Sequence, residues 1–197
     1  YLDQPIRLET LQLTQFGEFG SDWQAQAYGG YLELMFAGVG GEVLYRPLNS
    51  TWGVGVDVNV VRQRDPASEL GLLDYQVETG HVTLYKDMPN FYDFRVKLSA
   101  GRYLAGDVGG TVDISREFAS GVVVGGYFAK TNVSAEEFGE GSFNKGFYLQ
   151  VPLDLLTIGH TKSKASLGFN PIQRDGGQKL SRRNSLWSSS ELRGPRQ

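Results

Sequence analysis

The feature that most constrains this sequence is a strict alternation of apolar and polar side chains within residues 91–130. In residues 91–104 apolar side chains take the even positions and polar ones the odd positions: Tyr92, Phe94, Val96, Leu98 and Ala100 against Asp93, Arg95, Lys97 and Ser99. Residues 108–118 repeat the pattern, with Arg116 as the exception. Because successive residues of a β-strand point to opposite faces, each run predicts a strand with one apolar and one polar face.

The length of these runs favours a membrane β-barrel over a soluble sandwich. Each run is about ten residues long, which is enough for a tilted strand to cross a bilayer. Strands of soluble domains are usually about five or six residues long. The apolar face would then point to lipid and the polar face to the lumen.

Composition agrees with a β protein and excludes several other classes. The 197 residues include 26 glycines and ten tyrosines, which favour strands, turns and interfacial aromatics. The mean hydropathy is −0.29, and no stretch approaches about 18 apolar residues, so no transmembrane helix is expected. The chain has no cysteine, and therefore neither a disulfide framework nor a thiolate site. It starts without Met or a signal peptide, so we expect a processed piece of a longer protein.

The same pattern predicts strands along most of the chain and no helix. The predicted segments are 6–15, 30–37, 42–47, 52–62, 75–86, 91–104, 108–118, 122–130, 143–153, 164–172 and 179–188. The glycine-rich segment 38–41 is interpreted as a hairpin turn, and a break of phase in segment 6–15 as a bulge. The predicted fold class is all-β, an antiparallel up-and-down meander of about ten strands that forms part of an outer-membrane β-barrel.

Loop lengths suggest an orientation for such a barrel. The connections 63–74 and 131–142 are long, whereas 87–90, 105–107 and 119–121 are short. Counting hairpins places both long loops at one end. Outer-membrane barrels have long extracellular loops and short periplasmic turns, so 63–74 and 131–142 are predicted outside and 87–90 and 119–121 in the periplasm.

Charge is distributed unevenly. Residues 160–197 carry a net charge of +6 and residues 1–159 one of −9. The basic end is either a solvated tail or a surface for an anionic partner such as an acidic polysaccharide or a lipid headgroup. Nucleic acid is not expected, because no recognition element accompanies the basic residues.

Enzyme and metal signatures are nearly absent. His81 and His160 are the two histidines, and no Ser–His–acid spacing or second ligand accompanies them. We therefore expect no catalytic residue, no cofactor and no metal, and interpret His81 as a polar residue of the lumen or rim.

Four segments, in order, resemble exopolysaccharide proteins of the YjbH/GfcD type. They are 85–95 (YKDMPNFYDFR), 100–107 (AGRYLAGD), 139–147 (GEGSFNKGF) and 174–178 (RDGGQ), the last followed by Leu180 and Arg182. The resemblance covers most of residues 30–187. It implies a Gram-negative outer-membrane β-barrel, often a lipoprotein, encoded with exopolysaccharide or capsule assembly genes. Members are several times longer, so residues 1–190 would be the C-terminal portion of the barrel and 191–197 a tail.

The leading hypothesis is a non-enzymatic outer-membrane component that aids secretion or assembly of an exopolysaccharide. Its expected partners are the polymer, outer-membrane lipids and other polysaccharide-export proteins. A general porin, a polymer-modifying enzyme and a soluble periplasmic sandwich are the alternatives. Tyr92, Tyr103 and Tyr148 are expected at the membrane girdle.

Charged residues supply the candidate polymer-facing site. The candidates are Asp93, Arg95, Lys97, Asp113, Glu117, Arg174, Arg182 and Arg183. In the predicted strand 179–188, Lys179 and Arg183 share one face and Leu180 and Arg182 the other. The cationic face would hold an acidic polymer or pair with an acidic strand such as that of Asp113 and Glu117.

Overall fold

A computed structural model describes residues 8–68, 70–133, 143–153, 164–169 and 176–191. These residues form ten antiparallel strands in one sheet, in which each strand pairs with the next along the chain. The strands are β1 (Leu11–Phe19), β2 (Trp23–Tyr31), β3 (Phe36–Tyr45), β4 (Trp52–Arg64), β5 (Leu72–Met88), β6 (Phe94–Arg102), β7 (Val108–Glu117), β8 (Val123–Thr131), β9 (Asn144–Pro152) and β10 (Lys164–Phe169). The predicted all-β up-and-down meander is confirmed.

The N-terminal strands differ from the prediction. β2 was not predicted, and β3 runs straight through the glycine-rich segment 38–41 that was interpreted as a turn. A Cβ on Gly40 would come within 2.2 Å of the Asn59 side chain and 2.8 Å of the Tyr28 ring. Glycine therefore serves here to admit large neighbouring side chains within a strand, which a turn-based interpretation of glycine misses.

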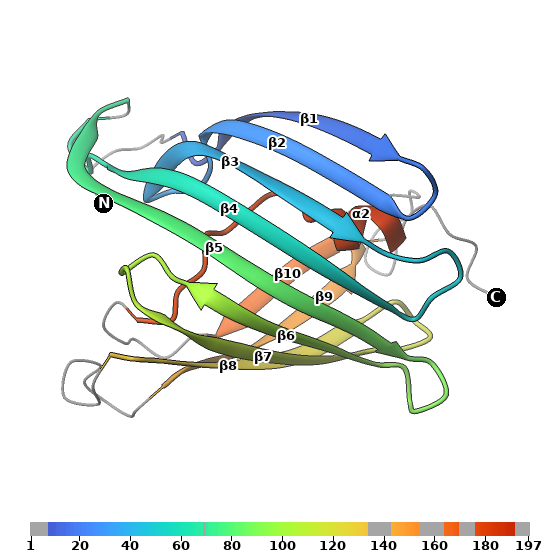
Figure 1. The fold of residues 1–197 in the computed structure, drawn as a ribbon. Helices are drawn as coiled ribbons and strands as arrows, with labels where there is room; N and C mark the ends of the chain where they lie inside the picture. Colours follow the sequence, from blue (N-terminus) through green and yellow to red (C-terminus); the bar gives the residue numbers. More distant parts are fainter. Residues whose placement is uncertain (1–7, 69, 134–142, 154–163, 170–175, 192–197) are drawn as a thin grey trace.

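The predicted strand 179–188 is also wrong. Residues 176–185 are irregular, and they lead into a short helix, α2 (Leu186–Glu191), although no helix was predicted. This C-terminal segment, residues 176–191, packs against the concave side of the sheet (Figure 1). The amides of Gly177, Ser181 and Leu186 donate to carboxylates of the sheet and its connections, so these groups do not need strand pairing.

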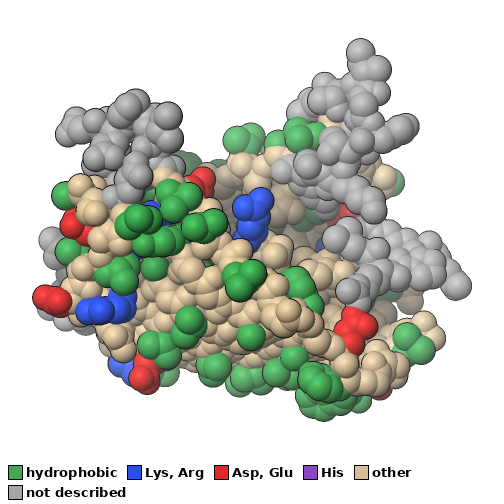
Figure 2. Space-filling model, turned by 90° about the horizontal axis from the view of Figure 1, so that it is seen from above, with side chains coloured by type: hydrophobic (Ala, Val, Ile, Leu, Met, Phe, Trp, Pro, Cys, Tyr) green, Lys and Arg blue, Asp and Glu red, His purple; other side chains and the backbone are tan. Residues whose placement is uncertain are grey.

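The apolar face of the sheet points outward, as the alternation predicts. Val58, Val82 and Ile114 are exposed on the outside, while Asp57, His81 and Ser115 are buried on the inside. Figure 2 shows hydrophobic side chains spread over the outer surface and charged ones mostly toward its two ends. This distribution is the reverse of a water-soluble sheet domain, whose apolar face is buried.

Small residues allow the sheet to curl. Gly101 on β6 and Gly109 on β7 lie opposite each other in register. A Cβ on Gly101 would meet the Gly80 carbonyl oxygen at 2.0 Å, and one on Gly109 would meet that of Lys130 at 2.1 Å. Only glycine permits this close approach of neighbouring strands at the bend.

Among the described residues, β1 and β10 are the two edges of the sheet and do not pair with each other. Closure into a barrel therefore stays a prediction. The antiparallel order places the β4–β5 and β8–β9 connections at one end and the β5–β6 and β7–β8 turns at the other, as expected. Within the described part of the chain, no helix is long and apolar enough to span a membrane.

Candidate functional site

The C-terminal segment crosses the concave face and is held there from several strands. At its start, the Gly177 amide donates to Asp107 Oδ2 at 2.8 Å, in the β6–β7 connection. Further on, the Ser181 amide donates to Glu33 Oε2 at 2.8 Å, in the β2–β3 connection. Burial raises the pKa of Glu33 above its ordinary value, although the Ser181 amide opposes this. The segment thus links opposite parts of the curled sheet.

An ion-pair network centres on Arg182 of this segment. Its guanidinium lies 3.0 Å from Glu42 Oε2 on β3 and 3.6 Å from Asp57 Oδ1 on β4. Glu42 also accepts hydrogen bonds from Gln26 Nε2 at 2.5 Å and the Leu186 amide at 3.2 Å. Burial opposes the charge of Arg182, but these carboxylates more than compensate and raise its pKa. Arg182 therefore pairs internally, with Glu42 and Asp57 instead of the predicted Asp113 and Glu117.

The need for Arg182 follows from the strand register. Glu42 and Asp57 lie directly opposite each other on β3 and β4, and both side chains point inward. Two like charges opposite each other destabilise a sheet unless a cation lies between them. A carboxylate in each of two otherwise apolar or glycine-rich runs was the signal in the sequence that marks this pair. The interpretation of segment 38–41 as a turn hid their register.

A second set of contacts extends from Asp57 to His81 on β5. Asp57 Oδ2 lies 3.7 Å from His81 Nδ1 and accepts a hydrogen bond from Asn59 Nδ2 at 3.0 Å. The His81 ring packs edge-on against Tyr103 at 4.8 Å. His81 is 4% exposed, and its Nε2 has no hydrogen-bond partner among the described residues. It is an inward polar residue, as predicted.

Four of the candidate residues face inward and pair with other side chains. Arg95 lies 3.1 Å from Glu117 and 3.5 Å from Asp87, while Lys97 lies 3.9 Å from Asp113. Tyr148 also donates to Asp113 at 3.0 Å. The inner wall of β5–β7 thus carries alternating charges that pair with one another.

The remaining candidates lie elsewhere. Asp93 is exposed in the β5–β6 turn with a positive φ of 53°, so it is not a strand residue. Arg183 belongs to the C-terminal segment and is exposed. Arg174 falls outside the described residues. Arg182 is the only one of the three candidate arginines in the basic end that the structure places in a buried ion pair.

Trp187 anchors the end of the segment and was missed by the sequence analysis. Its ring stacks on Tyr85 of β5, with centroids 4.6 Å apart and planes at 4°. The Arg46 guanidinium lies 4.3 Å from the centre of the Trp187 ring. The basic end is therefore not a solvated tail over residues 176–190, because Leu180, Leu186 and Trp187 are buried.

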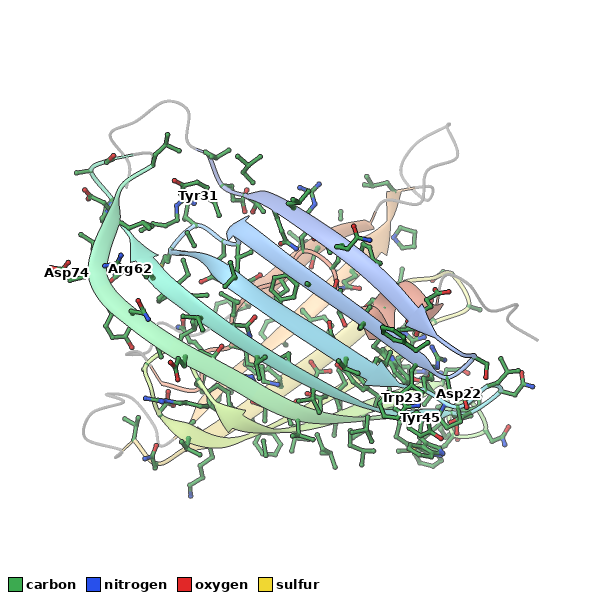
Figure 3. All side chains as sticks on the ribbon, turned by 45° about the horizontal axis from the view of Figure 1, so that its top comes forward. Asp22, Trp23, Tyr31, Tyr45, Arg62 and Asp74 are labelled. Atoms are coloured by element: carbon green, nitrogen blue, oxygen red, sulfur yellow. The ribbon has the colours of Figure 1, made fainter. Side chains whose placement is uncertain are left out.

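Exposed aromatic side chains gather at the end of the sheet that carries the β5–β6 and β7–β8 turns, which we call the short-turn end. Trp23 contacts Tyr45, with ring centroids 4.8 Å apart, and Tyr45 contacts Trp52 at 6.0 Å. Figure 3 shows Trp23 and Tyr45 beside Asp22 at this end, with Tyr31, Arg62 and Asp74 at the other end. Arg116, which breaks the alternation in residues 108–118, lies over the rings of Phe118 and Tyr92.

The three tyrosines expected at a girdle differ in position. Tyr92 joins the exposed aromatics at the short-turn end, beside Phe91. Tyr103 is fully buried and bonds to Thr111 at 2.6 Å, and Tyr148 points inward to Asp113. The girdle expectation is therefore wrong for Tyr103 and Tyr148, because their hydroxyls find partners on the concave side.

A cavity of about 550 Å³ lies between the C-terminal segment and the concave face. We refer to it as the inner cavity. Strands β4–β9 provide one wall, and residues 177–188 provide the other. Its polar lining includes Asp57, His81, Lys97, Asp113, Tyr127 and Lys179. In the described residues, no group of three or more acidic, histidine or cysteine side chains is placed to hold a metal ion.

Comparisons with known proteins agree on one family. The family described as "Exopolysaccharide biosynthesis protein YbjH" matches residues 1–191. The "Uncharacterized lipoprotein YjbH" of Escherichia coli (strain K12) is 50% identical over 196 residues. The match covers 98% of this chain and 28% of that protein, so the chain spans little more than a quarter of its relative. No solved structure matches the chain significantly.

Proposed function

Because this chain belongs to the YjbH exopolysaccharide biosynthesis family, we propose that it forms part of the wall of an outer-membrane β-barrel. The barrel would assist the secretion or surface assembly of an exopolysaccharide. The lipoprotein described in E. coli supports a membrane-associated location. The observation that carries the proposal is the reversed arrangement of the sheet, with apolar side chains outside and polar ones inside.

Each face of the sheet suits one surrounding in this proposal. The outer face presents valine, leucine, isoleucine and phenylalanine, as lipid requires, and the exposed aromatics suit the level of the headgroups. The inner face offers paired charges and hydroxyls, which suit a hydrated polymer that forms many weak hydrogen bonds. The edges β1 and β10 must then pair with further strands, because unpaired backbone groups are costly in lipid.

The role that we propose is not enzymatic. The carboxylates facing the inner cavity are engaged by Arg182, Tyr148 and backbone or side-chain amides. Glycoside hydrolysis needs an acid and a base or nucleophile on either side of the bond that breaks. A general porin is the second candidate, and the ion-pair network of Arg46, Asp87, Arg95 and Glu117 near the short-turn end favours it. Deletion of the gene distinguishes the two candidate functions. It should impair polymer export if the protein assists exopolysaccharide secretion, and small-solute uptake if the protein is a porin.

The outer face provides the direct test. Val58 lies in the middle of β4, is 62% exposed and points outward. In lipid, Val58→Arg should lower the free energy of unfolding by about 2–4 kcal/mol, because an arginine near the midplane must leave water. Gln76→Arg is the control, since Gln76 also points outward but lies nearer the strand end, where the cost is about 0–1 kcal/mol. The measurement is unfolding of the full-length protein in lipid vesicles.

The same substitution separates lipid from water. On a water-exposed face, Val58→Arg would change stability by less than about 0.5 kcal/mol. Equal stability of the two variants would therefore contradict the proposed location.

Topology is tested by thiol labelling. A cysteine at Ser68, in the β4–β5 connection, should react with an impermeant reagent on whole cells, because this end is proposed to face the outside. A cysteine at Asn90, in the β5–β6 turn, should react only after the outer membrane is opened. Both positions are exposed, so accessibility within the fold does not distinguish them. Labelling of Asn90→Cys alone on intact cells would reverse the orientation.

A further inference from the structure

Three polar groups of the inner cavity have no partner among the described residues. Lys179, from the C-terminal segment, makes no hydrogen bond or ion pair with any described residue. Neither the Tyr127 hydroxyl on β8 nor His81 Nε2 on β5 has a hydrogen-bond partner in the described part of the chain. His81 Nε2 is fully buried, and buried polar groups are nearly always hydrogen-bonded, whereas Lys179 and Tyr127 are half-buried. Together the three groups offer unused hydrogen-bonding capacity to a polar ligand in the cavity.

The carboxylates around the cavity do not neutralise Lys179. Asp57 is paired with Arg182, Asp113 accepts from Tyr148 and lies near Lys97, and Glu33 accepts the Ser181 amide. Burial is the main cause that lowers the pKa of Lys179, to about 8, while Asp57 and Asp113 favour its charged form. Lys179 is half-buried, and an ammonium group that is partly removed from water without a hydrogen-bonded anion is unfavourable. An anion from a ligand would relieve that cost.

We propose that the inner cavity binds an acidic sugar unit, whose carboxylate is received by Lys179. This proposal rests on the proposed function and narrows it to a polymer that carries carboxylates. His81 turns Nδ1 toward Asp57, which leaves Nε2 to form a hydrogen bond with a sugar hydroxyl. The Tyr127 hydroxyl donates to or accepts from a second hydroxyl. The combination of one ammonium with two hydroxyl partners fits a uronate better than a neutral sugar or a simple anion.

The test compares one oligosaccharide in two forms with the full-length protein in detergent micelles. The probes are an oligogalacturonate and the same oligomer with its carboxyl groups methyl-esterified, measured by titration calorimetry. The wild-type protein should bind the acidic form more tightly. Lys179→Gln should weaken that binding by about ten- to a hundredfold, the range for a charge-assisted hydrogen bond, and leave the ester form nearly unchanged. Arg183→Gln, which removes an exposed positive charge nearby, should leave both affinities unchanged.

Folding is monitored separately in each variant. Because Lys179 has no described partner, Lys179→Gln should keep or raise the melting temperature, so a loss of binding would not come from unfolding. Equal binding of the two forms, no binding of either, or full affinity in Lys179→Gln would each overturn the proposal. Lys179-dependent binding of inorganic phosphate in place of the uronate would also overturn it. None of these results affects the Val58→Arg comparison, so the proposed function stands or falls independently.

Discussion

Replacing Arg182 by methionine is expected to lower the free energy of unfolding by about 3–5 kcal/mol. The substitution keeps much of the side-chain volume but removes the cation between Glu42 and Asp57. Both carboxylates would then face each other across β3 and β4, buried and without their common partner. Breaking a buried ion pair on one side costs more than the pair contributes, because a charge is left uncompensated. The measurement is denaturant unfolding of the full-length protein, in which the folded fraction is monitored by heat-modifiability on gels.

Two further variants identify the cause. Arg183→Met changes the neighbouring arginine, which is exposed, and should alter stability by less than about 0.5 kcal/mol. Adding Glu42→Gln to Arg182→Met should recover part of the lost stability, because one of the two opposed charges is removed. If Arg182→Met and Arg183→Met prove equally mild, the internal ion pair is not a structural element and Arg182 is available to a ligand.

Local sequence patterns predicted the central strands correctly because each residue there obeys one rule. In β6 and β7 the inward positions include Lys97, Ser99, Asp113 and Ser115, and most outward positions are apolar or glycine. The outward exceptions, Arg102 and Arg116, lie at opposite ends of the sheet, where a long cationic side chain can reach water. Arg116 lies over the rings of Phe118 and Tyr92. The strand faces thus followed from period two alone.

The pattern failed where a side chain's partner lies far along the chain. β2 alternates glutamine with alanine only over residues 24–27 and continues as Tyr28-Gly29-Gly30-Tyr31, so the contrast in polarity between its faces covers only four residues. Gly40 of β3 is required by the neighbouring side chains of Tyr28 and Asn59, which no local sequence window contains. Residues 179–188 looked like a strand, yet their partners are Glu33 and Glu42, more than a hundred residues earlier. The inner cavity was unpredictable for the same reason, because about a third of its lining residues come from this misassigned segment.

Trp187→Ala is expected to lower the free energy of unfolding by about 3–5 kcal/mol and to loosen the end of the C-terminal segment. Trp187 is 3% exposed, and its loss would leave a void against Tyr85 and remove the ring beneath the Arg46 guanidinium. Without this anchor, α2 would be held mainly by two hydrogen bonds, from the Leu186 backbone amide to Glu42 and from Arg46 to Ser190. Trypsin should then cleave after Arg182 or Arg183 much faster in the folded protein.

Trp187→Phe separates packing from a general effect of mutation at this position. Phenylalanine keeps an aromatic face for Tyr85 and Arg46, so it should retain most of the stability and of the protease resistance. Faster cleavage in Trp187→Ala with unchanged global unfolding would show that the segment detaches locally while the sheet stays folded. Wild-type cleavage and stability in Trp187→Ala would instead mean that the ion pairs of Arg182 hold the segment without its aromatic anchor. The two anchors are therefore distinguishable, since Arg182→Met leaves the Tyr85–Trp187 stack in place and Trp187→Ala leaves the Glu42–Arg182–Asp57 contacts in place.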